Sequence, residues 1–317
     1  MVDQSRRQLE EISEDVLLDA FAPFFKDNSP DLRNTALVNK TFNGFFQSRY
    51  KVGLLLGYVA EGNQDMAEKI LSAYPELLLE RGTVIDPSGR KFTNITAFEL
   101  ILWTLDVRYM GQMMINCIPQ NEEGEMLRKE LLTQYERFEK KGGVTYEYKG
   151  QTHTEKYFNF EPLLNALKTY SENLTLWTHE QGKNYWCTVV GRLQRDLPTH
   201  VRQHYCAPDE PFYPLPQFDQ GEFNRTLNIQ NCVTDEEQIW NEELDAKLGI
   251  DFGIEGAKIW DIGTEDAACR VRAVDVNHDL AALTRLREVR MQDCALLKEQ
   301  LECPPQPVYD SKSLWEW

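Results

Sequence analysis

The chain reads LLLGYVAEGNQDMAEKILSAYPELLL from Leu54 to Leu79 and TAFELILWTLDVRYMGQMMINCIP from Thr96 to Pro119. In the first stretch, apolar residues recur at helical spacing on both sides of Gly62-Asn63, a dipeptide typical of a short turn between helices. In the second, Thr96 precedes an apolar run and Glu99 follows three residues later, which is the capping-box arrangement that starts a helix. The two stretches therefore predict two helical hairpins, around which the rest of the chain is organised.

An extended polar loop is predicted between the hairpins. It reads RGTVIDPSGRKFTNI over 81–95, and Asp86-Pro87-Ser88-Gly89 is a good β-turn sequence. The order of these elements resembles that of ankyrin repeats, which also have a helix start, a Gly-Asn turn, a return helix and an extended finger. The equivalent turn positions Asn63 and Asp106 are about ten residues further apart than the usual ankyrin period of roughly 33. Generic antiparallel helices are the alternative.

The second hairpin is rich in aromatic and sulfur-containing side chains. Such a set is typical of a helical core. Methionine is also used at adaptable binding surfaces, so a partner groove is the second interpretation. Trp103 and Met110 are therefore candidate partner-binding residues as well as candidate core residues.

Composition limits the classes of partner. The chain has 317 residues, and 42% of them are hydrophobic, which suffices for a core in one large or two modest domains. The formal net charge of −17 repels phosphate, so neither nucleic acid nor an anionic membrane is an expected partner. No apolar run approaches the roughly 18 residues of a membrane span, and the polar start lacks the apolar region of a signal peptide. Seven scattered cysteines without a CxxC pair favour reduced thiols.

Residues 1–50 form the first predicted segment, in which two helices are expected. Ser29 is placed to cap the second helix, with Pro30 at its first position. The order of elements resembles an F-box, the module that docks on the Skp1 adaptor of cullin ubiquitin ligases, although Ile12-Ser13 stands where an F-box has Leu-Pro. A helical cap over the first hairpin is the alternative. The resemblance implies these partner-binding residues: Val16, Leu17, Phe21, Leu32, Leu37 and Val38.

The predicted domains are 1–50, the hairpins of 51–120, and a mainly helical C-terminal body over 121–317. Gly142-Gly143 ends a charged amphipathic helix at the start of this body. Residues 144–157 change to β periodicity and predict a β-hairpin with a Lys149-Gly150 turn. The other expected elements are helices over 161–173, 175–195, 198–206, 235–247 and 279–302, and an extended surface segment, PDEPFYPLP, over 208–216.

A few side chains in the body are candidates for chemistry. His200 and His204 are four residues apart and share a helix face with ligand spacing, and Cys206 follows them, but no HExxH motif is present. Cys187 with His200 or His204 would make a thiolate–base pair. Ordinary packed side chains are the simpler interpretation. We therefore assign no catalytic residue, no metal ligand and no cofactor.

Three longer stretches carry a wider resemblance. They are 81–106, 150–170 and 186–212, the last reading WCTVVGRLQRDLPTHVRQHYCAPDEPF. Together they resemble F-box/ankyrin-like effectors that Legionella and related intracellular bacteria inject into host cells. The resemblance implies type IV secretion and action in the host cytosol, and it supplies no catalytic motif.

The preferred hypothesis is a mainly α protein that acts as a scaffold for host proteins. Its finer form is an adaptor to a cullin-type ubiquitin ligase through Skp1. The alternative is an enzyme of an unfamiliar class that uses Cys187 with His200 or His204. A module that assembles only with itself is a third hypothesis.

Overall fold

The structure, a computed structural model, describes residues 40–303 apart from 208, 226, 232–235 and 257–264. The F-box-like residues Val16, Leu17, Phe21, Leu32, Leu37 and Val38 lie outside the described residues. The described part is mainly helical with a four-stranded antiparallel sheet, so the predicted fold class is confirmed. Within these ranges, no helix combines the length with the hydropathy that crossing a membrane requires.

The first predicted hairpin is confirmed. Helix α4 spans Lys40–Ala60 and α5 spans Gln64–Ala73. The turn between them needs glycine, because Gly62 has a φ of +67°. Asn63 then caps α5 by accepting a hydrogen bond from the Met66 amide. A short 3₁₀ helix, η2 (Pro75–Leu78), follows, and the predicted domain boundary at residue 50 falls inside α4.

The second predicted hairpin is also confirmed. It consists of α6 (Ala97–Thr104), the π-helical turn η3 (Val107–Gly111) and α7 (Gln112–Asn116). Leu105 ends α6 in the left-handed conformation, with a φ of +66°. Most side chains of α6 are buried, since this helix lies between α4, the sheet and α8.

The cap of α6 is an internal feature of the core. The Thr96 hydroxyl accepts from the Glu99 amide at 3.0 Å and donates to Gln134 Oε1 at 2.9 Å, and the Glu99 carboxylate accepts from the Thr96 amide. Thr96 is fully buried, so removing its hydroxyl also leaves Gln134 without this donor.

We expect Thr96→Ala to lower the free energy of unfolding by about 1–2 kcal/mol. Urea unfolding followed by circular dichroism measures this. Thr178→Ala is the matched control, because Thr178 also forms a capping box, with Gln181, but is exposed. The Thr178→Ala variant should lose about 0.5 kcal/mol of its free energy of unfolding. Equal losses in the two variants would contradict an internal role for Thr96.

The sheet joins two hairpins that are distant in sequence. Strands β1 (Gly82–Ile85) and β2 (Lys91–Ile95) pair with each other, as do β3 (Val144–Tyr148) and β4 (Gln151–Glu155). Lys91 and Phe92 of β2 then pair with Glu147 and Tyr146 of β3. The 144–157 hairpin is confirmed, whereas the expected polar loop at 81–95 is itself a β-hairpin. Its tip is held by the Asp86 carboxylate, which accepts from the amides of Ser88 and Arg90.

Most of the predicted C-terminal helices are present. Helix α8 spans Glu122–Lys141 and ends at Gly142, and α9 spans Glu161–Asn173 as predicted. The helix predicted over 175–195 begins only at α10 (His179–Tyr185), because Thr178 and Gln181 form a capping box there. It continues as the π-helical η4 (Trp186–Gly191) and α11 (Arg192–Arg195), and α12 (Thr199–Cys206) follows.

Two predictions for the part of the chain after α12 need correction. The segment 208–216 does not simply lie on the surface, because Glu210 and Phe212 are buried while Tyr213 and Leu215 are exposed. The helix predicted over 235–247 begins at Asn241, whose side chain caps α13 (Glu242–Lys247). The residues before it form a second small sheet of β5 (Asn228–Asn231) and β6 (Glu236–Ile239).

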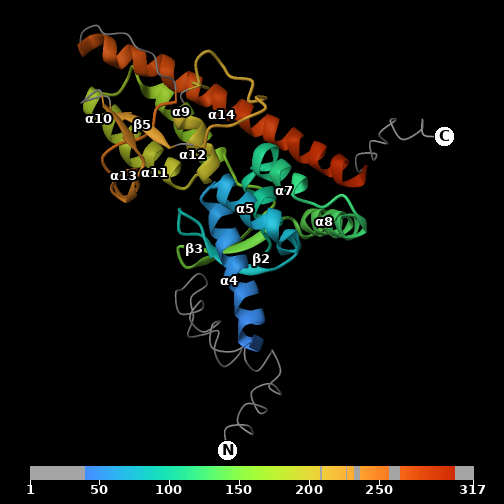
Figure 1. The fold of residues 1–317 in the computed structure, drawn as a ribbon. Helices are drawn as coiled ribbons and strands as arrows, with labels where there is room; N and C mark the ends of the chain where they lie inside the picture. Colours follow the sequence, from blue (N-terminus) through green and yellow to red (C-terminus); the bar gives the residue numbers. More distant parts are fainter. Residues whose placement is uncertain (1–39, 208, 226, 232–235, 257–264, 304–317) are drawn as a thin grey trace, which may run out of the picture.

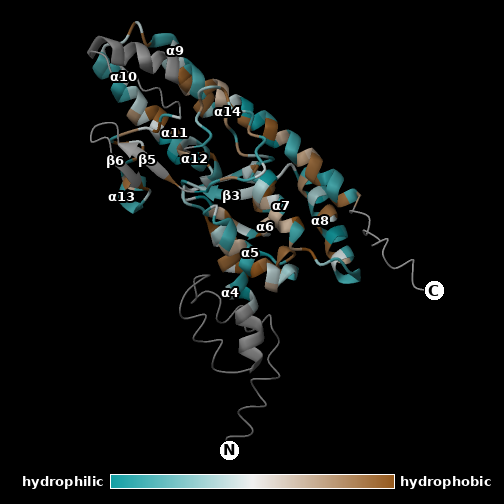
Figure 2. Cartoon of the chain, turned by 45° about the horizontal axis from the view of Figure 1, so that its top comes forward, coloured by the Kyte–Doolittle hydropathy of each residue, from teal (hydrophilic) through white to brown (hydrophobic). Residues whose placement is uncertain are grey.

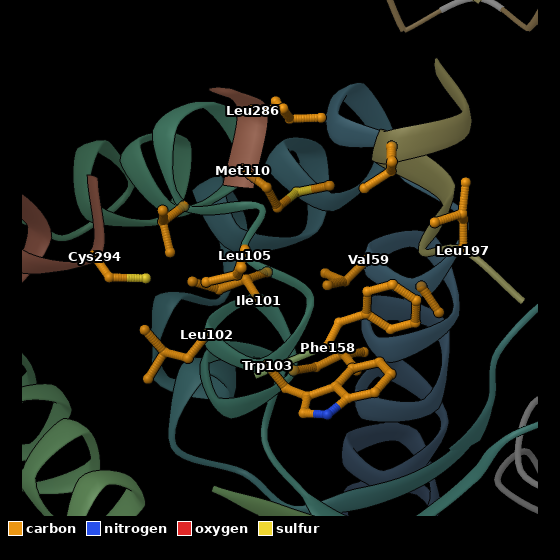
Figure 3. Close-up of a cluster of buried hydrophobic side chains, with 14 of the residues drawn as sticks. Val59, Ile101, Leu102, Trp103, Leu105, Met110, Phe158, Leu197, Leu286 and Cys294 are labelled. Atoms are coloured by element: carbon orange, nitrogen blue, oxygen red, sulfur yellow. The ribbon is translucent and has the colours of Figure 1, made fainter. Parts of the chain in front are cut away.

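The terminal helix is longer than predicted and ties the molecule together. Helix α14 spans Glu265–Glu302, and its coloured part in Figure 2 alternates between hydrophilic and hydrophobic residues. It runs past α9 at one end and past α7 and α8 at the other (Figure 1). Its Leu286 and Cys294 enter the same core as Ile101 and Met110 of the second hairpin (Figure 3). A single hydrophobic core therefore connects the hairpins to the C-terminal helices.

Candidate functional site

Helix α12 docks on the turn of the first hairpin. Every side chain from Thr199 to Cys206 is buried. The Thr199 hydroxyl donates to the Ala60 carbonyl at 2.8 Å, and the Gln203 amide group donates to the Gly62 carbonyl at 3.5 Å. A Cβ atom on Gly62 would lie only 2.9 Å from Gln203 Oε1, so glycine also permits this approach. The turn that the sequence predicts as a plain connection is thus a docking point for the C-terminal half.

A buried ion pair stands beside this contact. Arg225 Nη1 and Nη2 each donate to one oxygen of Asp106 at 2.8 Å, which is the bidentate geometry of strong arginine–carboxylate pairs. Arg225 Nε donates to Gln64 Oε1 at 2.9 Å, so one guanidinium reaches both hairpins. Burial acts to raise the pKa of Asp106, but Arg225 overcomes it and lowers the pKa to about 2. Asp106 is therefore charged at neutral pH.

His204 connects α12 to α14. Its Nε2 lies 3.3 Å from Arg290 Nη2, and its Nδ1 lies 3.1 Å from Glu210 Oε2. Because a guanidinium only donates hydrogen bonds, Nε2 must be the acceptor, and the ring proton of neutral His204 is on Nδ1. Burial and the Arg290 cation lower the pKa of His204 well below its ordinary value, and burial raises the pKa of Glu210 to about 7.

Arg290 extends the contact to the second hairpin. Its Nη1 donates to Asp293 Oδ2 at 2.8 Å and to the Phe218 carbonyl at 3.1 Å. Asp293 in turn pairs with Arg108 of η3 at 3.0 Å. These charged residues form one continuous boundary between the hairpins, α12 and α14. We call the following set the junction network: Asp106, Arg108, His204, Glu210, Arg225, Arg290 and Asp293.

Aromatic rings fill the space inside the junction network. The Phe223 ring stacks between His204, at a centroid distance of 4.1 Å, and Tyr109, at 5.0 Å. The Arg290 guanidinium lies over the Tyr109 ring at 5.0 Å. The charged groups therefore sit in a medium of low polarity, where both correct pairing and an unpaired charge have large energetic effects.

The structure places the candidate partner-binding residues of the second hairpin in the core. Trp103 and Met110 are both 0% exposed, and Figure 3 shows them among the side chains that join α6 to α14. Trp103 contacts the rings of Phe92 and Phe158, so it packs the sheet against α6. The core interpretation of these two residues therefore applies in this structure.

The candidate catalytic side chains make separate structural contacts. The Cys187 thiol donates to the Asp251 carbonyl at 3.3 Å, and Cys206, the last residue of α12, is buried. The His200 and His204 rings contact each other edge to face at 6.4 Å. Burial lowers the pKa of His200 to about 4. Among the residues that the structure describes, no three His, Cys, Asp or Glu side chains are grouped as metal ligands.

Sequence reasoning missed the arginine contacts that join the halves, of which two are instructive. One is the Asp106–Arg225 pair, for which a single acid inside the apolar run LWTLDVRYM was an available signal, since isolated buried acids are nearly always paired. The other is Arg90, which donates to the Asp196 carbonyl at 2.8 Å and lies over the Tyr148 ring at 4.9 Å. Nothing local in the sequence indicates that partner.

These contacts define a mainly helical protein in which a hairpin-and-sheet half is locked to a helical C-terminal half. Residues 162–301 match the family model of the CBUA0006 C-terminal domain. The uncharacterized protein CBUA0006 of Coxiella burnetii is 35% identical over 262 residues, which cover 78% of this chain and 74% of that relative. The chain therefore belongs to the CBUA0006 family. No solved structure matches the chain.

The family model covers the C-terminal side of the junction network. Its first residue lies in α9 and its last in α14, so it includes His204, Arg225 and Arg290. Asp106 and Arg108 lie outside it, in the hairpin half. The family domain therefore meets the rest of the chain through the junction network.

Proposed function

We propose that this protein is a bacterial effector that acts in a host cell as an interaction scaffold. The observation that carries the proposal is the use of its buried polar side chains. In the described residues, the Asp106–Arg225 and Arg108–Asp293 ion pairs lie between the two halves and hold them in one arrangement. A scaffold needs such a fixed arrangement in order to present surfaces at a constant distance. Membership of a family with a Coxiella burnetii protein supports a bacterial setting.

The enzyme alternative receives less support from the geometry. A working Cys187–His204 pair requires a free ring nitrogen on His204, yet Nδ1 faces Glu210 and Nε2 faces Arg290. His200 is buried, and its pKa of about 4 makes it a weak base at neutral pH. The scaffold function is therefore the better supported of the two.

A finer form of the proposal assigns a partner to the N-terminal segment. The F-box-like pattern of residues 12–50 suggests docking on Skp1, and α4 continues from Lys40 into the body of the protein. A partner that binds at this end would be held in a fixed orientation to the hairpins. The remaining surface would then present a second host protein to the ubiquitin ligase.

We expect the full chain to bind purified Skp1 saturably and Leu17→Ala/Leu32→Ala to bind at least about tenfold more weakly, which corresponds to about 1.4 kcal/mol. Biolayer interferometry measures this, and circular dichroism confirms that the variant is folded. Ile85→Ala is the matched control, because Ile85 is an apolar residue that is 64% exposed in the body. Absence of wild-type binding would overturn the adaptor form.

The broader scaffold proposal has its own test. The full chain is used to capture proteins from host cytosol, beside an unrelated helical protein of similar net charge. A specific partner must then bind the purified chain directly. If every retained protein also binds the acidic control, the scaffold proposal fails, whatever the result with Skp1.

A further inference from the structure

Two buried histidines lie one helical turn apart on α12, where the two halves meet. His200 is 3% exposed and His204 is 1% exposed. Of the two, His204 makes the contact with α14, through Arg290 Nη2 at 3.3 Å. The titratable and charged groups around the pair come from every neighbouring element: Asp106 and Tyr109 of the second hairpin, Glu210 and Arg225 of the loop after α12, and Arg290 and Asp293 of α14.

The bond between His204 and Arg290 exists only while His204 is neutral. Protonation turns Nε2 from an acceptor into a donor, so two donors and two positive charges would face each other at this contact. The stacked ring of Phe223 leaves this site poorly hydrated, which strengthens the repulsion. The contact that holds α14 to α12 would therefore be lost.

Glu210 cannot offset this charge in acid. Its carboxylate accepts the other ring proton of His204, so an ionised Glu210 would stabilise a charged histidine. Burial raises the pKa of Glu210 to about 7, however, so the carboxyl becomes neutral as the pH falls below this value. As the pH falls, Glu210 therefore loses its negative charge before His204 gains a positive one.

We infer that the His204–Arg290 contact is an acid-sensitive latch, in which protonation of His204 releases α12 from α14 while the hydrophobic core that joins α14 to the second hairpin stays packed. The inference depends on the contacts of α12 and α14 and is independent of the proposed scaffold function. It adds a means by which a change in acidity would alter the packing of α12 inside the C-terminal half.

The pH range follows from the protons that each state binds. The folded pKa of His204 lies well below 6.5 and that of His200 is about 4, so below pH 6.5 the open state binds both protons more readily. Glu210 acts in the opposite direction between about 7 and 4.5, because the closed state holds its proton more tightly. Asp106, with a pKa of about 2, contributes only below about 3.8. The net uptake approaches one proton only well below pH 6.5, so the opening constant should rise with a slope that steepens toward about tenfold per pH unit near pH 5.

Hydrogen exchange of the full chain tests the latch. Exchange at pH 7 and pH 5 is corrected for intrinsic rates, and the amides of α12 are compared with those of α8. We expect the opening of α12 to increase by about tenfold from pH 7 to pH 5, because the net uptake approaches one proton only toward the lower value, while α8 stays unchanged. Equal protection of α12 at both values would overturn the inference.

A non-titrating variant identifies the residue responsible. His204→Asn retains an N–H donor near the Nδ1 position but cannot take up a proton, so the contributions of His200 and Glu210 should cancel and the pH dependence should disappear. His153→Asn is the matched control, since His153 lies on β4, stacked on Tyr146, and should retain the wild-type dependence. Retention of the wild-type dependence in His204→Asn would overturn the inference.

A second measurement uses only the wild-type chain. Carbon-13 NMR of histidine-labelled protein reports the protonation of each ring directly. We expect the signals of His200 and His204 to remain neutral at pH 5.5 in the closed state and to become protonated only together with the loss of α12 protection. A His204 signal that titrates near 6.5 without any opening would contradict the latch.

Discussion

Replacing Asp106 with alanine is expected to lower the free energy of unfolding by about 3–5 kcal/mol, because removal of one partner leaves a buried charge without compensation. The charge in question is the Arg225 guanidinium, whose side chain is only 11% exposed and which donates twice to Asp106. Urea unfolding followed by tryptophan fluorescence measures the loss.

A double-mutant cycle separates the pair from its surroundings. Arg225→Ala should be similarly destabilising, and the double variant should be less destabilised than the sum of the two losses, since the residues act together. Glu172→Ala is the control, because its partner Lys168 is exposed and surface pairs of this kind contribute about 0.5 kcal/mol or less. If Asp106→Ala loses no more than this control, the junction does not depend on the buried pair.

The second large effect is expected for Trp103→Ala, which should lower the free energy of unfolding by about 3–5 kcal/mol. The Trp103 ring is fully buried and lies 4.9 Å from Phe92, 5.3 Å from Tyr146 and 5.7 Å from Phe158. Its removal leaves a cavity where α6 meets β2 and β3. Differential scanning calorimetry measures the change.

Two further substitutions show whether the loss comes from this cavity. Trp103→Phe keeps a ring in the site and should recover part of the stability, since the residual cavity is smaller. Leu176→Ala removes an apolar side chain that is 77% exposed and should change the free energy by about 0.5 kcal/mol or less. A near-native Trp103→Ala would be incompatible with Trp103 as a core residue.

The two largest predictions concern neighbouring positions of the second hairpin. Trp103 lies on α6, where it binds the sheet, and Asp106 lies in the following turn, where it binds Arg225. The four-residue segment 103–106 thus contacts both the sheet and the C-terminal half. This is why the hairpin stretch organises the chain, and the effects of the two variants should be coupled if the segment moves as a unit.

Local residues determined much of the secondary structure. The Gly62-Asn63 turn, the Thr96–Glu99 capping box and the β-hairpin of β3 and β4 were all predictable, because each depends on groups only a few positions apart. Where local signals were overlooked, as with the caps at Thr178 and Asn241, the predicted helix boundaries were wrong.

Only the tertiary structure decided how these elements meet. Asp106 and Arg225 are separated by 119 positions, and His204 and Arg290 by 86, and hydrophobic periodicity contains no information about such partners. The same limit applies to β2 and β3, whose pairing turns two local hairpins into one sheet. The sequence alone determined which segments become helices and turns, since those depend on nearby hydrogen bonds. Long-range packing decided which charges are buried together, because burial depends on the whole chain and gives the junction network its altered pKa values.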